Sequence, residues 1–263
     1  MASVLKPGEV VQGTDRAEAQ KKLINLVPVL LVFGLLTAIY AGLRIYTQMY
    51  AFEHGLDSTT PEFEKYWMGL LKLEVPLIFG VGIAIWTWLW VTRDKNLHKL
   101  DAETELKRYF GLVAWFLCYT FSFVFIASFF GEGDAVWHQT VVRDTSFTPS
   151  HIVVFYACIP LYIVVGVGSL IYATTRLPKY AYTYSVPMIM VVLGPALILP
   201  NLGFNEWGHA FWITEEIFTH PLHWGFVVLG WTGLGFGGAL LQVVARMAEL
   251  FMQIKSGQRP AVA

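Results

Sequence analysis

Residues 201–223 concentrate side chains that bind transition metals, and they lie between two long apolar segments. Asn205 and His209 are four residues apart, which places them on one face if this stretch is helical. His223 follows fourteen residues later, at the start of the next apolar segment. This spacing predicts a ligand pair on one helix and a third ligand supplied by its neighbour.

The same pattern occurs earlier in the chain. Asp134 and His138 are again four apart, and His151 follows thirteen residues later, where it also opens an apolar segment. We therefore predict two three-ligand metal sites at a similar depth in a membrane bundle. Their members are Asp134, His138 and His151 in one, and Asn205, His209 and His223 in the other.

The ligand types leave the metal open, because imidazole nitrogen suits copper, iron and zinc, and two histidines with a carboxylate can also hold non-haem iron. Neither trio contains a thiolate. Three protein ligands leave coordination positions free for oxygen or a substrate, as in catalytic metal sites. Each histidine could instead be an ordinary interfacial residue. Two similar trios beside apolar segments favour metal binding, because strongly polar groups there are costly without partners.

The composition indicates a polytopic membrane protein. Of the 263 residues, 56% are hydrophobic and 14% are charged, whereas about a quarter are charged in soluble domains. The apolar segments can cross a hydrocarbon core of about 30 Å, which takes roughly 20 helical residues. We expect no nucleic-acid partner, and no disulfide framework, because Cys118 and Cys158 both lie in apolar segments.

We expect an all-α bundle of about six transmembrane helices over residues 23–247, between a polar N-terminal segment, 1–22, and a C-terminal tail, 248–263. A seventh helix at 201–220, re-entrant or interfacial, is an alternative, because its two ends could return to the same side. The expected spans are 23–49, 74–91, 110–130, 151–173, 184–199 and 223–244.

Particular residues add detail to this division. Residues 51–67 are expected to form an acidic loop, Arg44 to extend its charge toward the interface, and Pro160 to kink the fourth span. Glu74 begins the second span, so we expect it near a membrane boundary, paired with a basic residue of another span or subunit.

The basic residues predict the orientation. Six spans put both termini on one side, together with the loop after the second span, which is the most basic of the chain. The opposite side carries only Lys65, Lys72 and Arg143. Both termini should therefore be cytoplasmic, and both ligand stretches should lie toward the outer face.

Three long motifs, RDTSFTPSHIVVFY, LPNLGFNEWGHAFW and PLHWGFVVLGW, are unusual. Through them the chain resembles the C subunit of the copper membrane monooxygenases, a family that includes particulate methane monooxygenase, ammonia monooxygenase and relatives acting on short hydrocarbons. The resemblance continues from GLDSTTPEFEKYWM through TRDKNL and ATTRLP to the last span. It therefore covers nearly the whole chain.

The resemblance implies copper at both predicted sites. One family site uses Asp-x-x-x-His and a later histidine, which maps onto Asp134, His138 and His151. The other uses Asn-x-x-x-His and a later histidine, which maps onto Asn205, His209 and His223, where we place catalysis. The resemblance also implies a trimer of three-subunit protomers, with A and B subunits as partners, in a bacterial inner or intracytoplasmic membrane. This chain should be inactive alone.

The implied reaction uses O2 to oxidise ammonia, methane or a short-chain hydrocarbon. Ser146 looks more like the ammonia branch, whereas FFGEGDAVWH lacks the glutamate-glutamine pair expected before Asp134. The substrate thus stays open. Two other classes of function also stay open: a structural and electron- or proton-delivering scaffold subunit, and an unrelated transporter with polar residues at the midplane.

Overall fold

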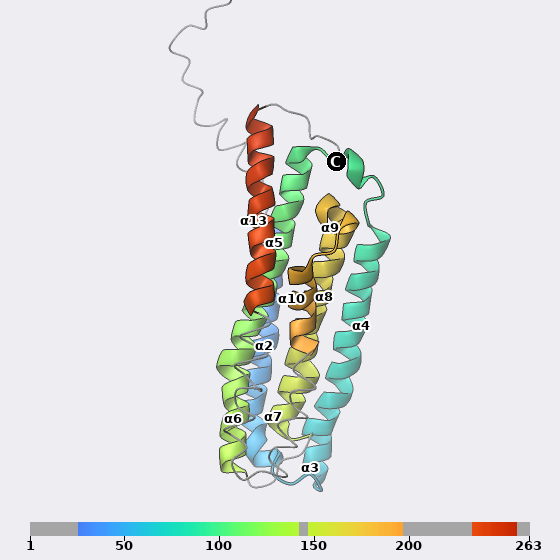
Figure 1. Ribbon diagram of the computed structural model, residues 1–263. Coiled ribbons are helices and arrows are strands. Elements are labelled where there is room, and N and C mark those ends of the chain that lie inside the picture. Colours follow the sequence, from blue (N-terminus) through green and yellow to red (C-terminus); the bar gives the residue numbers. More distant parts are fainter. Residues whose placement is uncertain (1–25, 142–146, 197–232, 257–263) are drawn as a thin grey trace, which may run out of the picture.

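The computed structural model describes residues 26–141, 147–196 and 233–256. This part of the chain is a bundle of helices (Figure 1), without strands among the described residues. The elements are α2 (Val27–His54), α3 (Pro61–Phe63), η1 (Glu64–Met68), α4 (Gly69–Val91), η2 (Leu97–Lys99), α5 (Ala102–Phe125), η3 (Ile126–Phe130), α6 (Gly131–Thr140), α7 (Pro149–His151), η4 (Ile152–Cys158), α8 (Ile159–Arg176), α9 (Pro178–Tyr182), α10 (Val186–Ala196) and α13 (Gly233–Ser256).

The expected all-α membrane bundle is confirmed. Among the described residues, five helical runs are long and apolar enough to cross a membrane: Val27–His54, Pro61–Val91, Ala102–Phe130, Pro149–Arg176 and Gly233–Ser256. The fifth expected span, 184–199, contains α10, and its last residues lie outside the described part. So do the alternative helix at 201–220, the start of the sixth span and the polar N-terminal segment.

Polar caps extend the helices beyond their apolar segments. The second run begins at Pro61, because the Thr60 side chain accepts a hydrogen bond from the Phe63 N–H and proline suits the first helical position. The loop expected at 51–67 is therefore confined to residues 55–60: helix continues to His54 and resumes at Pro61.

The third and last runs also differ from the expected bounds. Ala102 rather than residue 110 begins the third run, after Asp101 caps it by accepting a hydrogen bond from the Thr104 N–H. The last run continues to Ser256 rather than ending near Val244. Hydropathy marks the apolar part of a helix, whereas capping marks its ends.

The run that ends in α8 forms the centre of the bundle. Its most apolar stretch is 78% buried, against 11% for α2. α4, α5 and α10 pack around α8, and α6 and α7 lie at the end of the bundle opposite α9 (Figure 1). Apolar side chains on the outer helices remain exposed, as a lipid or subunit environment requires.

α4 and α8 run in the same direction in close contact. The Trp86 indole N–H donates to the Val164 carbonyl at 3.1 Å, and Arg176 donates to the Leu89 carbonyl at 3.0 Å. A Cβ on Gly82 would lie 2.6 Å from Cγ2 of Val164. This glycine therefore permits the close approach and fixes the register of the two helices.

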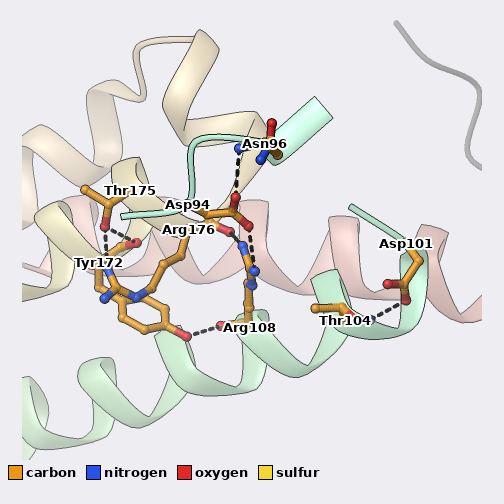
Figure 2. A network of polar contacts seen from close by, with 8 residues as sticks. All are labelled: Asp94, Asn96, Asp101, Thr104, Arg108, Tyr172, Thr175 and Arg176. Atoms are coloured by element: carbon orange, nitrogen blue, oxygen red, sulfur yellow. Dashed lines mark hydrogen bonds and ion pairs between the residues drawn. The ribbon is translucent and has the colours of Figure 1, made fainter. Parts of the chain in front are cut away.

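A polar network lies at the end of the bundle that contains α9, opposite α6 and α7 (Figure 2). The Arg108 guanidinium donates to the Asp94 carboxylate at 2.7 Å and to the Arg176 carbonyl at 2.9 Å. The Tyr172 hydroxyl donates to the Arg108 carbonyl at 3.1 Å. The backbone N–H of Asn96, and then Arg108, hold the pKa of Asp94 below its usual value. These contacts join the loop after α4 to α5 and α8.

Candidate metal centre

Asp134 and His151 face each other at the end of the bundle that contains α6 and α7. The Nε2 atom of His151 lies 3.4 Å from Oδ1 of Asp134, and the two side chains are 3% and 11% exposed. The carboxylate comes from α6 and the imidazole from α7. The structure therefore brings together two of the three ligands predicted for the first site.

Helix geometry positions both residues. The third run winds without interruption from α5 through η3 into α6, so Asp134 lies one turn beyond a π-helical segment. His151 ends α7, which Pro149 begins after Thr148 in extended conformation. The π-helical η4 follows at once and ends at Cys158, two residues before Pro160. Such π segments occur frequently at functional sites, because they shift side chains out of α-helical register.

Each residue of the pair has an aromatic side chain about one helical turn further along the chain. The His151 ring meets Phe155 edge to face, with centroids 5.2 Å apart. Trp137, three residues after Asp134, is buried and packs against Phe52 at 5.4 Å. Apolar rings exclude water, and this strengthens electrostatic interactions between the groups they enclose.

Arg44 places a positive charge beside α6. A Cβ on Gly133 would lie 2.8 Å from Nη1 of Arg44, so the glycine before Asp134 leaves room for the guanidinium. The sequence suggested only that Arg44 extends toward the interface. Its place against Gly133 depends on how α2 packs on α6, which hydropathy does not reveal.

His138 lies on α6, one turn after Asp134, as the spacing predicted. Its side chain lies outside what the structure describes. Within the described residues, no three histidine, cysteine or acidic side chains form a group that could hold a metal ion. The described geometry therefore includes the side chains of two predicted ligands, and the third is placed by its backbone alone.

The separation of the pair is compatible with a shared metal ion. Two ligands at about 2.1 Å from a tetrahedral ion lie about 3.4 Å apart, the separation observed between Nε2 and Oδ1. Direct N–H···O hydrogen bonds are shorter, about 2.7–3.2 Å. A carboxylate oxygen and an imidazole nitrogen are also suitable donors for copper or zinc.

The second predicted site, Asn205, His209 and His223, lies outside the described residues. Its metal ligation stays a prediction from spacing and resemblance.

Glu74 was expected near a membrane boundary, paired with a basic residue. It lies thirteen residues inside the continuous helical run Pro61–Val91, because the helix begins earlier than expected. It is buried, and its carboxylate oxygens have no hydrogen-bond partner in the described part of the chain. The expected basic partner is therefore absent among these residues. A single acidic residue in an apolar run was the sequence signal.

Two comparisons bear on function. A family model that describes the C subunit of ammonia monooxygenase/methane monooxygenase matches residues 11–254. A search of curated proteins gives no match. The family match covers both predicted ligand trios and nearly all of the five described membrane runs, the last of which continues two residues further.

Proposed function

The chain belongs to the family of C subunits of ammonia and methane monooxygenases, and from this premise we propose that it binds copper through Asp134, His138 and His151. It is a membrane subunit of a multi-subunit monooxygenase complex. We propose that the complex uses O2 to oxidise ammonia, methane or a short-chain hydrocarbon, and that this chain contributes its embedded copper sites.

The buried Asp134–His151 pair is the observation that supports copper binding. Copper held in the embedded sites would supply the redox chemistry that activates O2, so that one oxygen atom enters the substrate and the other leaves as water. The chain's own part is to hold the ligands rigidly, one on each of two helices. The rings of Phe155 and Trp137 keep water away from them.

We extend the proposal to Asn205, His209 and His223 on their spacing. An amide and two histidines would form a second copper site, and we place catalysis there. The two sites would then divide the reaction between substrate oxidation and electron supply.

The assembly and orientation are also proposed. A and B subunits would complete each protomer, with three protomers in a trimer, surrounded by lipid of a bacterial inner or intracytoplasmic membrane. The end of α4, the start of α5 and the end of α13 share one end of the bundle (Figure 1). That end carries the basic loop of 92–101, so it would face the cytoplasm with both termini. The Asp134–His151 end would face the periplasm.

His151→Ala and Asp134→Ala in the assembled complex test the proposal. Each variant removes one ligand, so we expect copper per complex to fall and O2-dependent product formation to be lost, while the subunits still assemble. His98→Ala is the matched control, because His98 is exposed in η2 at the other end.

The outcomes separate the alternatives. Normal copper content in both variants would reject the site. Loss of copper with full oxidation of substrate would favour a scaffold subunit whose partner performs the oxygen chemistry. Solute flux through a complex that contains no metal would indicate a transporter.

A further inference from the structure

Glu74 is a buried carboxyl group deep inside a membrane-spanning helix. It lies thirteen residues after Pro61 and seventeen before Val91, so it is about 20 and 25 Å from the two ends at 1.5 Å per residue. Only 5% of its surface is exposed. Neither carboxyl oxygen has a hydrogen-bond partner among the described residues. An ionisable group in this position indicates function, because it is costly to keep there.

The register of α4 against α8 places Glu74 beside η4. Gly82 meets Val164, and the parallel course of the two helices brings the preceding turns of α4 against η4. Cys158, the last residue of η4, lies close enough to Glu74 for their charges to interact. Cys158 is fully buried.

Other polar side chains gather around Cys158. Tyr40 of α2 and Ser122 of α5 are fully buried and lie beside each other. Tyr40 also interacts with Cys158. Glu74, Cys158, Tyr40 and Ser122 thus come from four different segments. Together they form a buried polar cluster inside an apolar bundle.

This cluster favours the neutral form of Glu74. An ionised carboxylate without hydrogen bonds in an apolar interior is far more costly than the acid. Among the described residues, the thiol of Cys158 on η4 and the hydroxyl of Tyr46 on α2 interact with it, and neither carries a positive charge. Lys72, two residues earlier on α4, is exposed and pairs with Glu64.

The cluster lies deeper in the bundle than the candidate metal ligands. Cys158 follows His151 by seven residues along one helical run, which is roughly 10 Å along its axis. The cluster that contains Glu74 is therefore separate from the Asp134–His151 pair and lies further along the bundle.

We propose that Glu74 is a proton donor for the oxygen chemistry of the complex. This role rests on the proposed monooxygenase function, in which O2, two electrons from a two-electron reductant and two protons convert the substrate into its hydroxylated product and water. The O–H bond of Glu74 breaks as its proton moves to the neighbouring side chains of the buried cluster, with Tyr40 and Ser122 as carriers. The cluster passes a proton on toward the oxygen atom that leaves as water, and the carboxylate then regains a proton from the aqueous phase.

Substitutions in the assembled complex test this role. Glu74→Gln keeps shape and polarity but cannot release an acidic proton, whereas Glu74→Asp keeps the acid. Glu62→Gln makes the same chemical change at an exposed position of the same helical run. At saturating substrate we expect turnover to fall about 100-fold or more in Glu74→Gln, to recover partly in Glu74→Asp and to be unchanged in Glu62→Gln. Unchanged turnover in Glu74→Gln would overturn the role.

Infrared spectra test the proton independently of turnover. We expect the carbonyl stretch of a protonated carboxylic acid, shifted by D2O, in the wild-type complex and not in Glu74→Gln. If that variant does not assemble, Glu74→Asp replaces it, because aspartic acid shifts the band instead of removing it. A complex that oxidises substrate but has no such band overturns the role of Glu74 alone. A complex that has the band but oxidises nothing overturns the monooxygenase function, and the donor role with it.

Discussion

Replacing Gly82 by alanine tests how closely α4 packs against α8. The added Cβ would lie 2.6 Å from Cγ2 and 3.5 Å from Cγ1 of Val164, whereas carbon atoms pack at about 3.5–4.0 Å. Val164 is buried, and a β-branched side chain in a helix has one strongly preferred rotamer. It cannot turn away, so the helices must separate by about 1 Å.

The clash should outweigh the helical preference for alanine. Overpacking a closely packed interior destabilises by about 1–3 kcal/mol, and replacing glycine inside a helix stabilises by only about 0.5–1 kcal/mol. We therefore expect Gly82→Ala to lower the free energy of unfolding by about 1 kcal/mol. Gly80→Ala is the matched control, because a Cβ there would meet nothing within 4 Å. It should be neutral or slightly stabilising.

Thermal unfolding of the assembled complex in lipid nanodiscs, followed by circular dichroism, measures the difference. Val164→Ala removes the opposing methyl groups, so the double variant with Gly82→Ala should show coupling between the two positions. If Gly82→Ala is as stable as Gly80→Ala, the register of α4 against α8 is wrong. The position of Glu74 beside Cys158 would then be wrong as well.

Two further predictions concern polar contacts at the end of the bundle opposite the Asp134–His151 pair. The pKa of Asp94 is lowered in the folded protein, so its contacts stabilise the fold above the unfolded pKa of the carboxyl and are lost as pH falls through the folded pKa. The melting temperature should therefore fall in acid, and it should fall less in Asp94→Asn. An equal acid loss in that variant would contradict the assignment. The Arg246 guanidinium donates two hydrogen bonds at 3.0 Å to the Glu105 carboxylate, whose side chain is only 4% exposed. Arg246→Ala removes both bonds and should lower the free energy of unfolding by about 3–5 kcal/mol. Glu249→Ala removes the other, 56% exposed partner of Arg246 and should change it by less than about 1 kcal/mol in denaturant titration.

The membrane runs could be predicted from the sequence because the membrane acts on every residue of a span. About twenty apolar residues in succession form a helix there whatever their neighbours are. The helix ends were less accurate. Thr60 and Asp101 begin helices through local capping, which extends them into charged segments that hydropathy excludes.

The meeting of Asp134 with His151 was predicted in outline only. Their spacing and the resemblance indicated that they belong together, but the distance depends on how α6 ends and α7 begins. The place of Arg44 was missed for the same reason. Contacts between helices depend on particular small residues such as Gly133 and Gly82, and their position along a helix gives no sign of which neighbour they face.

Pulsed electron paramagnetic resonance of Cu(II) in the assembled complex tests most directly whether Asp134 and His151 bind copper. Coordinated imidazole leaves a characteristic nitrogen modulation on the copper signal. In the wild type we predict the modulation of two imidazoles at this site, from His138 and His151, and in His151→Ala that of one imidazole or loss of the signal. A spectrum and copper content unchanged by His151→Ala would contradict the site.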